Sequence, residues 1–207
     1  MRIGIGIDTG GTYTDAVAFD FEERKVLAKG KSRTTKEDLS VGITGALDFI
    51  PADLRQSAEF IALSTTLATN ACVEDKGCRA RLVLMGTTEK VLRRIDAQKS
   101  YGLNYEDVLC LNTKCSFDGS VVDEPDWETL VAQHGEWFAQ AQAISLCEAN
   151  AARNGAVCER AGKAYLSKRY QVPFVTGCEL SHDVNMMSRG ATALLNARLL
   201  PVIDEFL

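Results

Sequence analysis

The sequence has little of what many protein sites are built from. It holds only two histidines, and no two of its seven cysteines stand in a Cys-x2-Cys pair. Cys110 and Cys115 are near enough along the chain to share a metal ion, but no cluster of histidines accompanies them. The cysteines are odd in number and scattered, which argues against a disulfide framework. We therefore expect reduced thiols, as in a cytoplasmic protein.

Long apolar runs and basic clusters are also missing. No stretch approaches the ~20 apolar residues of a transmembrane helix, and the N-terminus has no signal-peptide pattern. The net charge is −5 and no basic patch stands out, which argues against binding to nucleic acid. With 46% hydrophobic and 25% charged residues, the composition is that of an ordinary globular protein. We expect a cytoplasmic protein that binds neither membranes nor nucleic acids.

What the sequence does have is an unusual beginning. Ile3, Ile5 and Ile7 alternate with glycines and lead into Asp8, a period of two that predicts a β-strand. Gly10 and Gly11 follow and predict a tight turn. Residues 12–19 then predict a second strand paired with the first in a hairpin.

The residues of this turn suit a phosphate group. Gly10 and Gly11 let backbone N–H groups approach an anion closely, and Thr12 adds a hydroxyl beside them. Asp8 is placed to hold a hydrated divalent cation. The alternative is a purely structural hairpin. No lysine follows the glycines and the next element is a strand, which excludes a P-loop and a dinucleotide fingerprint.

The rest of the chain alternates predicted strands and helices, which indicates an α/β fold. Thr35-Lys36-Glu37-Asp38 has the form of a capping box and predicts a helix that ends at Pro51. Pro201 is expected to kink or interrupt the last helix, which begins near Arg189. The remaining predictions are strands near 25–32, 60–63, 80–85, 143–147 and 172–176, helices from 126 and over 150–170, and an irregular insertion at about 95–125.

Three further segments extend the match of the opening turn to a known family. The turn itself resembles the first phosphate-binding hairpin of the superfamily of actin, heat-shock chaperones and sugar kinases. Ser64-Thr65-Thr66-Leu67-Ala68-Thr69-Asn70-Ala71-Cys72-Val73-Glu74 is similar to a segment of the hydantoinase/5-oxoprolinase family. The turn Leu180–Val184 and the pattern Arg189-x-x-Thr192-x-x-x-Asn196-Ala197 resemble that family's later motifs, while Met187 and the stretch 148–153 depart from them.

The resemblance implies a fold, an activity and a set of site residues. Residues 1–207 would be the N-terminal, ribonuclease-H-like domain of an enzyme that uses ATP and Mg²⁺ to open a cyclic amide such as a hydantoin or 5-oxoproline. Asp8 and Asp15 would be catalytic, with Asp8 at the metal. The phosphates would lie against Gly10, Gly11, Thr12 and Thr14, and the substrate-cleft candidates are Thr65, Thr66, Thr69, Asn70, His182 and Arg189. For residues 64–70 the alternative is a helix N-cap provided by Ser64 or Thr65.

One part of the superfamily's site has no match here. The chain contains no second Asp-x-Gly-Gly-Thr pattern, so the second phosphate loop and the adenosine contacts would lie in another domain or subunit. The last helix reaches Leu207 without a glycine cap, and we expect the natural protein to continue. This chain alone would then be inactive. A sugar-type kinase and an ATP-gated activator of a partner protein remain alternative functions.

Overall fold

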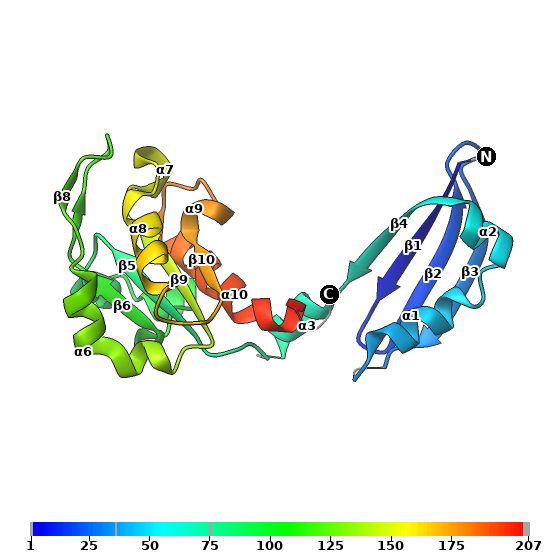
Figure 1. Ribbon diagram of the computed structural model, residues 1–207, viewed down its shortest axis with the longest axis horizontal. Helices are drawn as coiled ribbons and strands as arrows, with labels where there is room; N and C mark the ends of the chain where they lie inside the picture. The colour runs from blue at the N-terminus through cyan, green and yellow to red at the C-terminus, as the bar shows by residue number, and fades with distance from the viewer. Residues whose placement is uncertain (1, 36, 75, 205–207) are drawn as a thin grey trace. The chain divides into compact units, whose positions relative to one another are not determined.

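The computed structural model describes residues 2–35, 37–74 and 76–204. The chain divides into two compact units, Met1–Lys76 with Val202–Leu207, and Gly77–Pro201. Each contains its own four-stranded sheet (Figure 1). We call them the hairpin unit and the parallel unit. The patterns in the sequence pointed to one domain over 1–207, and this division is a finding of the structure.

The hairpin unit is built on a mixed sheet in the order β3-β2-β1-β4. β1 pairs antiparallel with β2 and parallel with β4, and β2 pairs antiparallel with β3. The predicted leading hairpin and mixed sheet are therefore confirmed. The elements in chain order are β1 (Ile3–Thr9), β2 (Tyr13–Asp20), β3 (Lys25–Arg33), α1 (Leu39–Leu47), α2 (Ala52–Ser57), β4 (Ala58–Thr65) and α3 (Leu67–Val73).

Helix α1 covers one face of this sheet. Ala46 and Ile50 pack on Ala16 and Ala18 of β2 in one buried cluster. The helix comes so close to β3 that a Cβ on Gly30 would lie 1.9 Å from the carbonyl oxygen of Ala46. The opposite face of the sheet has glycines along β1, and it is the face on which Asp8 is exposed.

The predicted capping box before α1 is wrong. The N-cap is Asp38, whose side chain accepts a hydrogen bond from the backbone N–H of Ser40 at 3.0 Å. A carboxylate directly before the first turn is as good an acceptor as the threonine that the pattern favoured. Thr35 lies outside the helix, and Lys36 is not among the described residues.

The parallel unit is built on a second sheet in the order β10-β9-β5-β6, in which all pairs are parallel. A short hairpin of β7 and β8 lies beside it. The elements in chain order are β5 (Ala80–Met85), α4 (Glu89–Arg94), α5 (Ala97–Tyr101), the 3-10 helix η1 (Tyr105–Asp107), β6 (Val108–Leu111), β7 (Lys114–Cys115), β8 (Val121–Asp123), α6 (Trp127–Ala139), β9 (Ala143–Glu148), α7 (Ala151–Asn154), α8 (Val157–Leu166), β10 (Phe174–Thr176), α9 (Gly177–Leu180) and α10 (Met186–Asp204).

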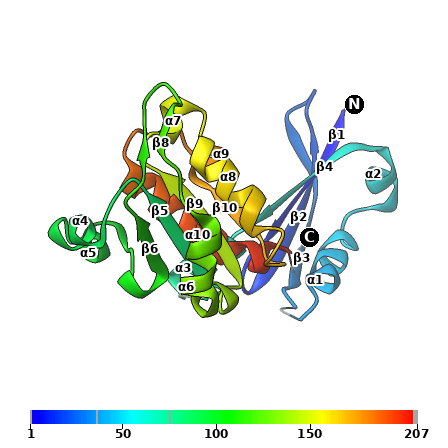
Figure 2. The same ribbon diagram turned by 60° about the vertical axis from the view of Figure 1, so that its left-hand side comes forward.

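Helices cover both faces of this sheet, as Figure 2 shows. Leu82 and Leu84 of β5 pack against α10 and the α4–α5 segment, whereas Val83 and Met85 pack against α6 and α8. Every residue of β5 and of β9 is buried, which explains why both strands are mostly apolar and do not alternate between apolar and polar residues. The predicted α/β class is thus confirmed.

Two segments differ from their predicted form. The stretch expected to be an irregular insertion, about 95–125, contains regular elements, and β6 within it pairs with β5 in the central sheet. The helix expected over 150–170 is divided into α7 and α8 because Gly155 and Ala156 both have positive φ angles, 75° and 56°. Short strands, and a change of backbone direction over two residues, leave little trace in the periodicity of the sequence.

Of the two effects expected of Pro201, a kink or an interruption of the last helix, the interruption is wrong, because α10 runs through it. A proline cannot donate to the carbonyl four residues earlier, which here belongs to Ala197. That carbonyl oxygen instead accepts from the Cys78 Sγ at 3.4 Å. The next carbonyl oxygen, of Arg198, accepts from the backbone N–H of Cys78 at 2.8 Å. The segment at Cys78 therefore satisfies the carbonyls of the last turns.

We expected all cysteines to be reduced, and this expectation is wrong. Cys158 is disulfide-bonded, while the other cysteines whose side chains are described are free: Cys72, Cys78, Cys110, Cys147 and Cys178. Spacing along a chain does not show which sulfurs meet in the fold. The side chain of Cys115 is not among those described, so the suggested Cys110–Cys115 metal pair lies outside them. No helix in the described part of the chain is long and apolar enough to span a membrane.

Candidate functional site

A row of polar side chains crosses the open face of the hairpin unit at the end of β1. Asp8 of β1 pairs in register with Asp15 of β2 on one side and with Ser64 of β4 on the other. Asp15 in turn pairs with Lys31 of β3. Partners in register share a face of the sheet, so the strand pairing alone brings the two predicted catalytic carboxylates side by side.

The two carboxylates differ in their neighbours. Asp15 accepts from the Lys31 Nζ on both oxygens, at 2.8 and 2.9 Å, in an exposed ion pair. For Asp8, no ion pair to another described residue is formed. The carboxylate of Asp8 is exposed, and a second negative charge stands beside it on Asp15. This arrangement favours a cation at Asp8.

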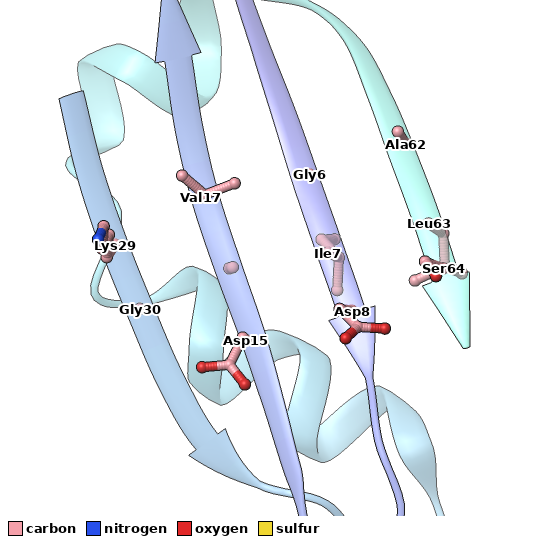
Figure 3. A pocket seen from close by; sticks show the side chains of 11 residues that line it. Gly6, Ile7, Asp8, Asp15, Val17, Lys29, Gly30, Ala62, Leu63 and Ser64 are labelled. Carbon is pink, nitrogen blue, oxygen red and sulfur yellow. The ribbon is translucent and has the colours of Figure 1, made fainter. Parts of the chain in front are cut away.

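A groove of about 420 Å³ runs along this face, and Figure 3 looks into it. Both carboxylates lie at one end of the groove, at the carboxyl end of β1. Its floor is flat because Gly6 has no side chain there. The lining residues are Gly6, Ile7, Asp8, Asp15, Ala16, Val17, Lys29, Gly30, Ala62, Leu63 and Ser64.

The predicted glycine turn lies directly beyond these carboxylates. The backbone N–H of Gly10 donates to the carbonyl oxygen of Tyr13 at 3.0 Å, which closes the turn. Added Cβ atoms would meet that oxygen at 3.1 Å from Gly10 and the Asn70 Nδ2 at 3.2 Å from Gly11. Both positions are therefore tight, and a side chain at either would have to displace its neighbour by a few tenths of an ångström. Thr12 is exposed at the tip of the turn.

Thr14 does not face solvent beside the turn. Its side chain is fully buried, and its hydroxyl is 3.0 Å from the hydroxyl of Thr34. The Thr34 Oγ1 also lies 2.8 Å from the carbonyl oxygen of Gly10, to which it donates. Thr14 is therefore placed to brace the turn from behind.

The segment Thr65–Asn70 lies against the same turn. The Thr65 Oγ1 donates to the carbonyl oxygen of Thr9 at 3.2 Å, and the backbone N–H of Thr66 points to the same oxygen at 3.4 Å. Thr66, not Ser64 or Thr65, is the N-cap of α3, and its side chain makes no capping bond. The alternative of a side-chain cap from Ser64 or Thr65 is therefore wrong.

Asn70 and Thr69 complete that segment. The Asn70 Nδ2 donates to the Thr66 Oγ1 at 3.3 Å and lies over Gly11, while Thr69 is exposed. Beneath them the Thr9 Oγ1 is buried and has no hydrogen-bond partner in the structure. The hydroxyl and amide groups of 65–70 therefore gather around the glycine turn.

The other two candidates, His182 and Arg189, belong to the parallel unit. His182 is exposed in the loop between α9 and α10. Arg189 is 1% exposed, and its guanidinium donates to the carbonyl oxygens of Asp183 and Glu148. Arg189 therefore clamps the end of β9 to the loop that carries His182, and its guanidinium is buried rather than presented to a cleft.

Arg189 adjoins a buried carboxylate network that the sequence reading missed. Glu148 and Glu159 are both fully buried, and each accepts a hydrogen bond of 2.9 Å from the backbone N–H of the other. Glu148 also accepts from the Asn154 Nδ2 at 2.6 Å, and Glu159 from the backbone N–H of Cys178 at 2.9 Å. Burial raises the pKa of Glu159 above its ordinary value. A glutamate at the end of a buried and mostly apolar strand was the available signal.

The donor set at the hairpin turn suits a phosphate-bound cation. Mg²⁺ prefers one or two carboxylates together with water and phosphate oxygens, and Asp8 and Asp15 offer two. A site made only of protein ligands is not formed, because no group of three His, Cys, Asp or Glu side chains converges in the described part of the chain. The turn and its two carboxylates are therefore suited to part of a shared site.

Several known proteins are similar to this chain in sequence and in fold. The model of the family described as hydantoinase/oxoprolinase N-terminal region matches residues 4–168. The caprolactamase subunit alpha of Pseudomonas jessenii is 24% identical over 223 residues, covering 98% of this chain and 32% of that protein. A crystal structure of the ATP-dependent caprolactamase from Pseudomonas jessenii has a TM-score of 0.70 at 24% identity, over 98% of this chain and 32% of that one. A nucleotide-free acetone carboxylase has a TM-score of 0.77 at 18% identity, over 98% and 33%. The chain thus spans about a third of the length of these relatives.

Proposed function

Because the chain belongs to the hydantoinase/oxoprolinase N-terminal region family, we propose that it provides one wall of the active site of an ATP-dependent cyclic amide hydrolase. The observation that carries this proposal is the pair of facing carboxylates, Asp8 and Asp15, beside the glycine turn at the end of β1. A relative in Pseudomonas jessenii is an ATP-dependent caprolactamase, which supports the same reaction class.

The chemistry explains why ATP is needed. An unstrained amide resists water because its carbon is a poor electrophile. When the amide oxygen takes the γ-phosphoryl group of ATP, a C–O–P linkage forms and ADP leaves. A first water adds to the carbon and the ring C–N bond breaks, with the nitrogen taking a proton. A second water displaces phosphate, which carries away the former amide oxygen.

The residues of the hairpin unit have separate tasks in this proposal. Asp8 would hold a hydrated Mg²⁺, and that ion would supply positive charge beside the phosphates. Gly10, whose backbone N–H and carbonyl oxygen are bonded within the protein, shapes the loop that faces the phosphates. The backbone N–H of Gly11 and the hydroxyl of Thr12 would donate to the phosphate oxygens. Asp15, paired with Lys31, would add a second carboxylate that orients a water molecule or accepts a proton. Thr14 acts from behind by holding the turn.

Four of the candidates for contact with the substrate lie beside the same turn. Thr65, Thr66, Thr69 and Asn70 offer hydroxyl and amide groups for the phosphates or the amide ring. His182 belongs to an exposed loop of the other unit. Arg189 is assigned to positioning that loop through its bond to Asp183.

The remaining wall of the site is proposed to come from another domain or subunit. Relatives are about three times as long as this chain, and residues 1–207 contain a single Asp-x-Gly-Gly-Thr pattern. We propose that this chain alone binds ATP weakly and does not turn over. Micromolar affinity for ATP, measured on residues 1–207 by calorimetry, would contradict this part of the proposal.

The test of the function uses the complete protein with ATP, Mg²⁺ and a panel of cyclic amides and sugars. Phosphate release that depends on a cyclic amide is the expected result. Formation of a sugar phosphate would replace the proposal with a kinase, and ATP hydrolysis that depends only on a partner protein would replace it with an ATP-gated activator.

A matched pair of variants tests the role of Asp8 in holding the cation. Asp8→Asn keeps the shape of the side chain and removes the charge that would hold the cation, so we expect loss of activity by at least about a hundredfold. Asp53→Asn, on exposed α2, makes the same chemical change away from the groove and is expected to leave the rate unchanged. Equal rates for the two variants would show that Asp8 has no such role.

A further inference from the structure

The parallel unit has its own crevice at the carboxyl end of its sheet. β5 is the first strand of this sheet, the next strand β6 lies on one side of it, and β9 and β10 lie on the other. The connection after β5 leads to β6 on one side, and the connection after β9 leads to β10 on the other side, so the two leave in opposite directions. In open parallel sheets, ligands bind outside the carboxyl ends of the strands at such a reversal of strand order.

A cavity of about 290 Å³ lies at this end of the sheet. Its lining comes from three segments, each of which follows the carboxyl end of a strand: the β7–β8 turn after β6, the segment after β9, and the loop after β10 and α9. The volume suits a small molecule and is too small for a nucleotide. The lining residues are Phe117, Ala149, Asn150, Ala152, Arg153 and Val184.

The ends of β5 and β9 pack closely beside this cavity, which Ala149 lines. Gly86, directly after β5, has a φ of +92°, and a Cβ there would lie 2.8 Å from the Cβ of Ala149. The backbone N–H of Ala149 donates to the carbonyl oxygen of Met85 at 2.9 Å. Small residues at both strand ends therefore form a narrow floor where β5 and β9 meet.

The walls are held by the buried network below them. Asn154 donates from its Nδ2 to Glu148 at 2.6 Å and also reaches the carbonyl oxygen of Ser116 at 3.3 Å, beside Phe117. Arg189 donates to the carbonyl oxygens of Glu148 and Asp183, and thereby holds the end of β9 and the loop of Val184. All three lining segments are thus fixed to one buried cluster, which is the preorganisation that a binding site needs.

Arg153 supplies the charge of this cavity. Its guanidinium lies over the Phe117 ring, 5.4 Å from the ring centroid. The face of the guanidinium thus contacts the ring, and the N–H groups at its edges are left for a ligand. No carboxylate among the described residues forms an ion pair with it. Ala152, Phe117 and Val184 add apolar surface around it.

From this combination we propose that the crevice at the carboxyl ends of β5 and β9 binds a small organic carboxylate, with the carboxylate on Arg153 and a short apolar body against Phe117 and Val184. A planar guanidinium matches a carboxylate through two parallel N–H···O bonds. The site uses none of the residues of the glycine turn, so it stands independently of the proposed hydrolase activity.

Butyrate and its neutral isostere butanamide test the proposal on the 207-residue chain. Each is titrated while backbone amide shifts are recorded by NMR. We expect saturable shifts with butyrate at Ala149, Asn150, Ala152 and Arg153, and no saturation with butanamide. Equal responses to the two probes, shifts confined to other residues, or tighter binding of methyl phosphate at these positions would each overturn the proposal.

Two arginine variants with the same chemical change complete the test. Arg153→Gln should weaken butyrate binding by at least about tenfold, since a charge-assisted pair of hydrogen bonds is lost. Arg160→Gln, on the exposed side of α8, should bind butyrate as the parent chain does. Amide spectra of both variants show whether the fold is kept. Unchanged affinity in a folded Arg153→Gln variant would overturn the proposal.

Discussion

At the scale of single residues, Thr34 connects the glycine turn to the sheet. Its hydroxyl lies between the carbonyl oxygen of Gly10 and the hydroxyl of the buried Thr14, and its backbone N–H donates to the carbonyl oxygen of Thr12 at 3.0 Å. The sequence analysis singled out Thr12 and Thr14 but not Thr34. Thr34 lies on a strand-end remote in sequence, and only the β2–β3 pairing brings it to the turn.

Thr34→Val removes both side-chain bonds at nearly constant shape. We expect the free energy of unfolding to fall by about 1–2 kcal/mol, because the Thr14 hydroxyl and the Gly10 carbonyl lose a partner. Chemical denaturation measures this. Thr44→Val, at an exposed position of α1, is the control and should change the free energy by less than about 0.5 kcal/mol. Equal effects would show that the Thr34 hydroxyl contributes nothing to the turn.

At the scale of secondary structure, elements with strong patterns were predicted well. β1, β2, β5 and β9 follow from alternation or from short apolar runs, and the structure forms strands at those places. β6 and α9 were missed, since the first is four residues long and partly exposed and the second is a single turn. The capping residue Asp38 and the continuous α10 depend on hydrogen bonds that a pattern does not contain.

The contact between β3 and α1 depends on one glycine. Gly30→Ala would place a Cβ 1.9 Å from the carbonyl oxygen of Ala46, so α1 must move away from the sheet. We expect a loss of about 3 kcal/mol in the free energy of unfolding, measured by urea denaturation. Gly135→Ala on α6 is the matched control, since nothing lies within 4 Å of its Cβ position. It should be neutral or slightly stabilising.

The β7–β8 hairpin should respond to acid. Hydrogen bonds from Ser116 and then from the backbone N–H and hydroxyl of Ser120 lower the pKa of Asp118 to about 2, from an ordinary value of 3.8. The pKa is lowered in the folded state, so these hydrogen bonds stabilise the turn fully at pH values above 3.8. The stabilisation is lost as the pH falls through about 2. The amide shift of Ser120 should titrate in that range by NMR. In Asp118→Asn it should not, and an unchanged titration would contradict the assignment.

At the scale of the whole molecule, the candidate site was predicted in part. The opening motif identified Asp8, Asp15 and the glycines, and the strand register places the two carboxylates side by side. The hydrogen bonds of Thr14 and Thr34 behind the glycine turn could not be predicted. The same holds for the network of Glu148, Glu159 and Arg189 in the parallel unit. Both consist of groups far apart in sequence that meet only when two strands and a helix are packed.

The division into two units also has a functional consequence. The glycine turn lies in the hairpin unit, whereas His182, Arg189 and the cavity at Arg153 lie in the parallel unit. A substitution in the hairpin unit is therefore expected to change the proposed hydrolase activity and not the binding of butyrate by the parallel unit. Asp8→Asn should leave the butyrate-induced shifts of the parallel unit unchanged, and amide NMR of that variant measures this. Loss of those shifts in folded Asp8→Asn would show that the two sites are not independent.

The most direct measurement for the proposed reaction follows the amide oxygen. A cyclic amide substrate of the complete protein is labelled with oxygen-18 at its carbonyl, and the phosphate released from ATP is analysed by mass spectrometry. Transfer of the γ-phosphoryl group to the amide oxygen predicts one labelled oxygen atom in each phosphate. Unlabelled phosphate, with the label retained in the carboxylate of the ring-opened product, would contradict the account.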